Sequence, residues 1–436
     1  AEIASRNAVF RTQTQPITLA LLQTSIPEDA ALIEFAVYTP YDVKTGKNGA
    51  PRYAAYLLAS RGQPRWADLG EAALIDQSVG ELRRALRNPR SGDAKQLART
   101  LDEKVMRPLR QHLGARQKIL LSPDGALNLI PFAALVDEHD HYLVNRYLFI
   151  YLTSGRDLLR LRIKQESQPA ALVLADPAFD SLQPADSAAL RDIKPVHGGQ
   201  QPGAPWFDFS AVQFKSLPGT ASEATALRAL LPEASILTGG AATESALKQL
   251  RRPRLLHIAT HGYFLKDLVL SQTIQSDANA PRLPDNTAES ENIENPLLRS
   301  GLALAGANRR KSGEEDGILT ALEATGLDLW GTKLVVLSAC DTGVGEVKNG
   351  EGVYGLKRAF VLAGSESQVM SLWAVSDMGT KELMVEYYKR LLRGEGRGEA
   401  LRQVQLRMLK NPKRSHPFYW ASFIQSGEWA NLDGKR

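Results

Sequence analysis

The stretch Lys333-Leu334-Val335-Val336-Leu337-Ser338-Ala339-Cys340-Asp341-Thr342-Gly343 decides the fold of this chain. Residues 333–339 form a mainly apolar run of strand length, which is typical of a strand buried on both faces of a parallel sheet. A glycine-rich segment (343–352) follows, and then a helical pattern over residues 353–363. A strand, a loop and a helix in this order predict one unit of a parallel α/β sheet. The strand leads directly into Cys340.

The same alternation continues in both directions along the chain. The apolar spacing predicts strands at 118–122, 147–152, 170–175, 234–237, 255–259 and 368–374, and helices at 78–88, 92–113, 221–231, 243–250, 377–393 and 397–410. Two β-rich runs, 31–38 and 53–58, predict a long hairpin around Gly46-Lys47-Asn48-Gly49. We therefore expect an α/β fold with a mostly parallel sheet flanked by helices.

The chain divides into three regions. Residues 1–28 are polar and weakly patterned, so we interpret them as a linker or as the tail of an upstream element. Residues 29–165 form a first α/β half and residues 166–436 a second. Within the second half, Thr243 precedes a helix as its N-cap, and Thr320-Ala321-Leu322-Glu323 has the spacing of a capping box. The polar segment 266–296 is long for a loop, and such loops are usually functional or disordered.

Composition excludes several classes of protein. The chain has 436 residues and a net charge of +5 from 53 Lys+Arg and 48 Asp+Glu, too small and dispersed to indicate nucleic-acid binding. No segment approaches the roughly 18 apolar residues of a membrane span, so we expect no membrane contact. The single cysteine excludes an intrachain disulfide and a cysteine-based zinc site, and it favours a reducing, cytoplasmic location. The start of the chain has no signal-peptide pattern, and it lacks a Met, so we expect a piece of something longer or a processed product.

Two predicted strands end in reactive side chains. Strand 255–259 leads into Thr260-His261-Gly262, and strand 333–339 leads into Cys340. Ligands of open α/β sheets bind beyond the carboxyl ends of the strands, so parallel, adjacent strands would bring His261 and Cys340 together, each followed by a turn. The imidazole would lower the pKa of the thiol, and the thiolate would be a nucleophile. Backbone N–H groups of Gly262 and Cys340 are candidates to hold the resulting oxyanion.

Each of these residues also has a plain structural explanation. A lone buried cysteine is usually a small hydrophobe, and a histidine at a strand end is more often structural than catalytic. His257 lies within its strand, two residues after Leu255 on the same face, and we expect it to be a core histidine or one that supports the site. The pattern alone leaves both the Cys-His dyad and the structural explanation open.

The motifs resemble those of CHAT-domain proteins, which are caspase-like cysteine peptidases of clan CD related to separases. The resemblance rests first on Leu255–Gly262 and Leu337–Gly343, and it extends in order over about residues 29–436. Further matching stretches are Ser122–Phe132, Pro296–Ala307, Gly350–Gly352, Leu356–Phe360, Ser371–Asp377 and His416–Phe423. The resemblance implies that Cys340 is the nucleophile and His261 the general base. It also implies a non-catalytic, caspase-like first half, in which Asp124 follows a strand much as Cys340 does.

The resemblance implies a substrate pocket beside the dyad. Asp377 lies where related peptidases place an acidic residue for a basic P1 side chain, although Ser376 or Asp377 equally fits the cap of the following helix. Asp341 is a second candidate for substrate contact, and an Asx turn that stabilises its loop is the alternative.

No cofactor or metal is expected. The segment Gly343–Gly352 lacks the G-x-G-x-x-G spacing and the Gly-Lys-Ser/Thr of phosphate-binding loops. His139-Asp140-His141 suggests a metal by composition, but an exposed polar turn between strands explains it better.

The sequence leaves three functions to distinguish. The first is a cysteine endopeptidase that cleaves a protein or peptide substrate. The second is a catalytically silent caspase-like scaffold or interaction module. The third is a peptidase held inactive until a partner, a ligand or an upstream TPR region rearranges the active-site loops; CHAT proteins commonly carry such repeats, but none is visible here.

Overall fold

The computed structural model of the protein describes residues 17–163, 165–180, 213–264, 296–338, 340–341, 351–373 and 377–435. The polar segment 266–296 and the glycine-rich segment 343–352 lie almost entirely outside these ranges. Within the described ranges, none of the helices combines the length and the hydropathy that a bilayer span needs.

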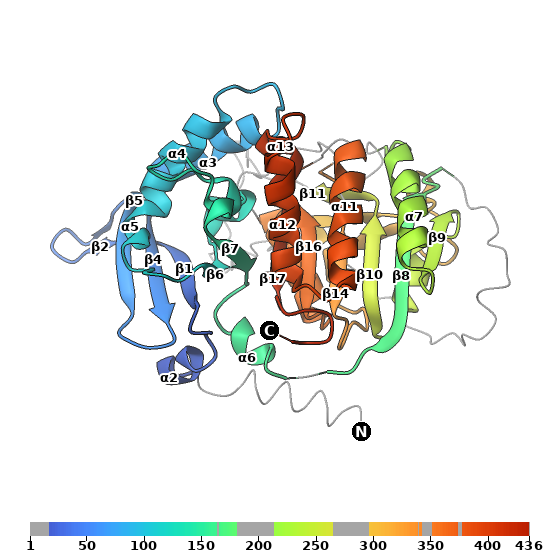
Figure 1. Ribbon diagram of the computed structural model, residues 1–436, viewed down its shortest axis with the longest axis horizontal. Coiled ribbons are helices and arrows are strands. Elements are labelled where there is room, and N and C mark those ends of the chain that lie inside the picture. The colour runs from blue at the N-terminus through green and yellow to red at the C-terminus, as the bar shows by residue number, and fades with distance from the viewer. Residues whose placement is uncertain are drawn as a thin grey trace, which may run out of the picture.

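One eleven-stranded sheet runs through the molecule in the order β5-β4-β1-β6-β7-β17-β16-β14-β10-β8-β9 (Figure 1). The strands of the first half are β1 (Ala30–Tyr38), β4 (Arg52–Ala59), β5 (Arg65–Glu71), β6 (Lys118–Ser122) and β7 (Leu148–Tyr151). The predicted hairpin is confirmed, because β1 pairs antiparallel with β4 and the turn between them holds the small strands β2 (Tyr41–Asp42) and β3 (Lys47–Asn48). The edge strand β5 was not predicted.

The second half supplies the parallel part of the sheet. Its strands are β8 (Gln168–Pro177), β9 (Ser235–Gly239), β10 (Pro253–Ala259), β14 (Leu334–Leu337), β16 (Ser367–Ser371) and β17 (Phe423–Gly427). Neighbours from β9 to β16 all pair in parallel, and only β17 is antiparallel to β16. All of β14 is buried, as expected for a strand covered on both faces. The predicted α/β sheet, mostly parallel and flanked by helices, is thus confirmed.

The two halves join where β17 lies parallel to β7, with Ser426 opposite Tyr151. Because β17 is antiparallel to β16, the strands β1, β6 and β7 run opposite to β10 and β14. Asp124 follows the carboxyl end of β6. This end therefore lies on the opposite side of the sheet, along the strand direction, from the carboxyl ends of β10 and β14. Asp124 accepts hydrogen bonds from the N–H groups of Val37 and Gly125, at 2.8 Å each, and so stabilises its own turn.

Helices cover the sheet. In the first half these are α2 (Leu19–Gln23), α3 (Ala72–Leu86), α4 (Ala94–Val105), α5 (Arg107–Arg110) and α6 (Asp157–Arg160); in the second they are α7 (Pro218–Leu230), α8 (Glu244–Lys248), α9 (Ala321–Ala324), α10 (Glu351–Leu362), α11 (Asp377–Leu392), α12 (Arg397–Leu409) and α13 (Pro417–Trp420). Figure 1 shows α7, α11 and α12 side by side over one face of the parallel strands. The helix predicted over 92–113 is broken between α4 and α5, because Pro108 lacks an N–H group and its ring clashes with the preceding turn.

Both predicted helix caps are present. The Thr243 hydroxyl accepts from the N–H of Ala246, and Thr320 and Glu323 form a reciprocal capping box. Local sequence therefore fixes these two helix starts.

Candidate active site

The site is built on the two strands that precede His261 and Cys340, and these strands are neighbours in the sheet. β10 pairs in parallel with β14, with Leu256 opposite Val335 and Ile258 opposite Leu337. Both strands lie in the core, and their four paired side chains are buried. The residues that follow them, Thr260 and Ser338, therefore leave the sheet at the same end of the strands.

Beyond that end of the strands the chain forms a second, four-stranded sheet in the order β13-β12-β11-β15. Its members are β11 (His261–Phe264), β12 (Ser300–Ala303), β13 (Ile318–Thr320) and β15 (Cys340–Asp341). β11 pairs in parallel with β15, which places His261 opposite Cys340 and Gly262 opposite Asp341. The turn expected directly after His261 is wrong: His261 begins β11, because β12 offers β11 an antiparallel partner. Cys340 begins β15, and the loop expected after it lies almost entirely outside the described residues.

The His261 ring is held by aromatic contacts and one hydrogen bond. Its centroid lies 5.3 Å from that of Phe179 and 5.8 Å from that of Phe214. Its Nε2 lies 2.7 Å from the backbone carbonyl of Lys215. Burial lowers the pKa of His261 below its ordinary value, and the hydrogen bond to Lys215 only partly opposes this. The neutral imidazole is therefore favoured.

The contact with Lys215 fixes the tautomer of His261. A carbonyl oxygen can only accept, so Nε2 carries the hydrogen in this contact. In the neutral ring the lone pair then lies on Nδ1. Nδ1 is buried and has no hydrogen-bond partner among the described residues. The ring is thus arranged to accept a proton at Nδ1.

A buried polar network joins β10 and the residue after β14 to helices α7 and α11. His257 is fully buried on β10, as expected, and its Nδ1 lies 3.0 Å from the Tyr388 hydroxyl of α11. Its Nε2 lies 3.1 Å from Oε1 of Glu223 on α7. The other carboxylate oxygen of Glu223 accepts from the Ser338 hydroxyl at 3.2 Å. Sequence reasoning missed Glu223 and Tyr388, because each looks like an ordinary residue of an amphipathic helix.

The remaining predicted site residues are placed by their backbones. Cys340 and Asp341 form β15, and Asp377 is the first residue of α11. The side chains of all three lie outside what the structure describes, so the roles predicted for them stay predictions. Gly262 is buried within β11, between Leu302 of β12 and Asp341 of β15.

Asp176 is a further acidic residue, at the carboxyl end of β8 and next to the carboxyl end of β10. Asp176 follows Ala175, which pairs with Ala259 of β10. Its backbone is left-handed, with a φ of 47°, a conformation that is uncommon for a residue other than glycine. Burial raises the pKa of its carboxyl group above the ordinary value. The sequence pattern did not single out Asp176, because it directly follows the predicted strand 170–175 and belongs to no motif.

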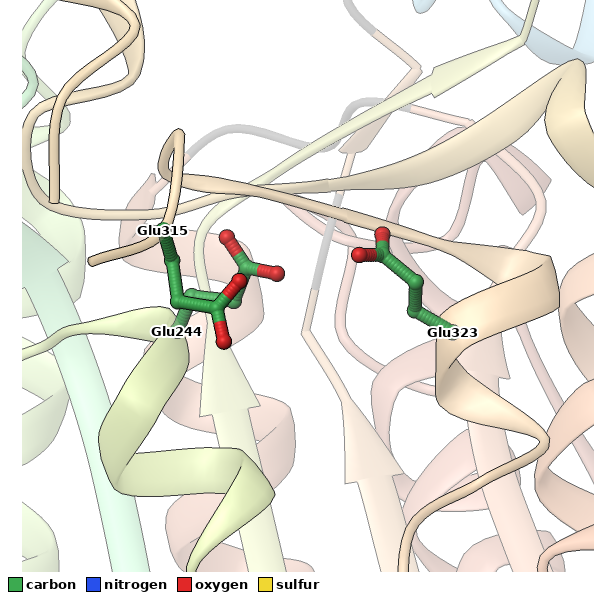
Figure 2. Close-up of side chains that lie close together, drawn as sticks. All are labelled: Glu244, Glu315 and Glu323. Atoms are coloured by element: carbon green, nitrogen blue, oxygen red, sulfur yellow. The ribbon is translucent and has the colours of Figure 1, made fainter. Parts of the chain in front are cut away.

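Three glutamates lie close together near the four-stranded sheet. Figure 2 shows the carboxylates of Glu244, Glu315 and Glu323 turned toward a common space. Lys248 Nζ lies 2.7, 2.8 and 3.1 Å from these three carboxylates, respectively. The carboxylates hold the pKa of Lys248 above its ordinary value. The Lys248 ammonium thus already provides a positive charge at this cluster. The ion pairs link α8, α9 and the connection between β12 and β13.

The histidine-rich motif His139-Asp140-His141 is a turn, as predicted. The N–H groups of His139 and His141 both donate to Asp137 Oδ1, at 3.0 and 2.9 Å, and Asp140 adopts a φ of 65°. The geometry is that of an Asx-stabilised turn.

Comparison with known proteins gives two curated relatives. They are tetratricopeptide repeat protein 28 of mouse and of human, each 25% identical over 74% of this chain. The aligned stretch is 12% of each relative, so the chain spans only about an eighth of their length.

Solved structures with a similar arrangement include two crystal structures of the Saccharomyces cerevisiae separase–securin complex. Their TM-scores are 0.48 and 0.43, with 8% and 9% identity, covering 98% and 94% of this chain and 31% and 30% of those chains. The Arg-specific cysteine proteinase gingipain R has a TM-score of 0.37 and 11% identity, over 82% of this chain and 74% of its own.

The family is shown by a direct match of the sequence. Residues 95–428 match the CHAT domain, a range that contains β6 and β7 of the first half and both His261 and Cys340. The chain therefore belongs to the CHAT-domain family.

Proposed function

We propose that this chain is a cysteine endopeptidase in which Cys340 is the nucleophile and His261 the general base. The observation that carries the proposal is the parallel pairing of His261 with Cys340, since neighbouring strands lie only about 4.8 Å apart. The tautomer of His261 supports the role of base, because Nδ1 is left without a partner among the described residues. The resemblance to CHAT-domain peptidases supports it independently.

The reaction would run in two steps. The Cys340 thiol transfers its proton to His261 Nδ1, and the thiolate attacks the peptide carbonyl. The N–H groups of Gly262 and Cys340 would hold the oxyanion, and the proton passes from His261 to the departing amine, which leaves a thioester. Water then gives a proton to His261 and attacks the thioester. The acid is released, and the proton returns to the thiol.

Substrate choice and control are further parts of the proposal. Asp377 and Asp341 are proposed to line a pocket for a basic P1 side chain. Activation is proposed to come from a partner, from a ligand or from TPR repeats upstream of the chain, because the relatives named for such repeats extend far beyond the aligned stretch. The second candidate function is a catalytically silent scaffold, for which the same relatives, named for their repeats, give only weak support.

Labelling of the thiol separates the two functions. Cys340 is the only cysteine, so one label per chain reports on this residue alone. We expect a peptide carrying an acyloxymethyl ketone to alkylate the wild-type protein at pH 7 at least about 10-fold faster than it alkylates glutathione, because a histidine-paired thiol is a stronger nucleophile at neutral pH. Mass spectrometry measures the rate. Cys340→Ser is the matched control for stoichiometry, and labelling no faster than that of glutathione would favour the scaffold.

The pH dependence follows from the environment of His261. Because burial lowers its pKa, the imidazole stays neutral to a lower pH than a free histidine. We expect the acid limb of kcat/KM to have its midpoint below pH 6.5. Titration of the His261 ring by NMR, assigned by comparison with His261→Ala, should give the same midpoint. A midpoint above pH 7 would contradict the proposed tautomer and burial.

A further inference from the structure

We propose that Glu223 is a positioning residue for the nucleophile; this inference rests on the proposed function of Cys340. Glu223 Oε2 accepts from the Ser338 hydroxyl at 3.2 Å, and its Oε1 lies 3.1 Å from His257 Nε2. Ser338 is two residues before Cys340. A side chain of α7 thus contacts the segment that leads from the sheet to the nucleophile.

The network is sealed from solvent. The relative exposures of Glu223, His257, Ser338 and Tyr388 are 2%, 0%, 4% and 1%, respectively. A carboxyl group withdrawn from water is costly unless donors surround it. An apolar residue at position 223 would fill the same space without this cost, so stability alone does not explain the glutamate. The glutamate instead contributes two carboxylate oxygens, one close to His257 on β10 and the other bonded to Ser338 after β14.

Glu223 faces two donors with its two oxygens. The Tyr388 hydroxyl can donate to His257 Nδ1, which leaves the ring hydrogen on Nε2, toward the carboxylate. Ser338 donates to the other oxygen. The contact with His257 is close but does not have the geometry of a hydrogen bond, so the bond from Ser338 is the one that carries the proposal. Glutamine has one acceptor oxygen only, and its NH₂ group would face one of the two donors.

The position of Ser338 determines where Cys340 lies. The Ser338 N–H donates to Ile258 O on β10 at 2.9 Å, which holds its backbone. Glu223 holds its side chain, so two contacts in different directions fix this residue. Two residues further on, Cys340 pairs with His261. A displacement of about 1 Å between reacting groups can lower the rate by about 100-fold. A small shift of Ser338 should therefore lower the reaction rate of the Cys340 thiol.

The test compares Glu223→Gln with Thr225→Ala, a control on the exposed side of the same helix, where the hydroxyl donates only to Ala221 O. The readouts are the rate of Cys340 alkylation between pH 5 and 10 and kcat and KM on a peptide substrate. We expect Glu223→Gln to lower alkylation at pH 7 and kcat by about 10- to 100-fold with little change in KM, and Thr225→Ala to match the wild type.

Two further variants keep the proposal falsifiable if Glu223→Gln does not fold. Ser338→Ala removes the donor, and we expect the same loss in alkylation rate. In Glu223→Gln/Ser338→Ala the losses should not add, since both changes break one contact. A folded Glu223→Gln or Ser338→Ala with the wild-type pH profile would overturn the proposal.

Amide hydrogen exchange separates this result from failure of the proposed function. If the wild-type thiol is no more reactive than glutathione, with the activator present if one is required, the proposed peptidase function is wrong, but Glu223→Gln should still lower the protection of the β15 amides relative to Thr225→Ala. Unchanged protection at Cys340 and Asp341 in a folded variant would overturn the positioning role by itself.

Discussion

Cys340→Ala is expected to abolish peptide cleavage, and His261→Ala is expected to lower kcat/KM by about 1,000-fold. Cys340→Ala removes the atom that forms the thioester. His261→Ala leaves the thiol but removes the acceptor of its proton, so the thiolate fraction at neutral pH falls. Steady-state kinetics on a fluorogenic peptide, with the activator present if one is required, measures both effects.

The matched control is His139→Ala. His139 is exposed in the Asp137 turn, away from the strands of the site, so its replacement should leave kcat/KM unchanged. Thermal unfolding of all three variants should stay near that of the wild type. Cleavage by the purified Cys340→Ala protein at the wild-type rate would contradict the role of this thiol as the nucleophile.

Arg397→Met is expected to lower the free energy of unfolding by about 3–5 kcal/mol, the largest effect we predict for a residue outside the site. Arg397 is fully buried at the start of α12. Its guanidinium donates to Ala430 O at 2.8 Å, to Ser367 Oγ at 3.1 Å and to the carbonyl of Lys333. Methionine fills similar space but leaves these buried acceptors without their donor. Urea unfolding followed by circular dichroism measures the change.

Arg407→Met on the same helix is the matched control. Its side chain is 61% exposed and its partner is Glu386, so its loss should change stability by no more than about 0.5 kcal/mol. Arg397→Lys should remain destabilised, because an ammonium offers its donors from a single point and cannot span the carbonyl of Lys333 just before β14, Ser367 on β16 and Ala430 in the C-terminal segment. Equal stability of Arg397→Met and Arg407→Met would contradict the conclusion that the buried hydrogen bonds of Arg397 stabilise the fold.

Features with a local cause could be predicted from the sequence. The apolar run at β14, the cap Thr243 and the capping box at Thr320 depend on neighbours within a few residues, and all three are present. The break at Pro108 also has a local cause, but the continuous apolar spacing of 92–113 obscured it. The antiparallel edge strand β5 has no strong alternation and forms because β4 offers it a partner.

The sequence by itself determined the α/β class, the order of most strands and helices, and the placement of one histidine and one cysteine at the carboxyl ends of two strands. Hydrophobic periodicity and helix caps act over short distances along the chain, so these features are readable without a structure. Only the tertiary structure decided that His261 and Cys340 pair in a second sheet, that the two halves run in opposite directions, and that Glu223 and Arg397 are buried. These features depend on backbone hydrogen bonds and contacts between segments far apart in sequence, for which the chain carries no local signal.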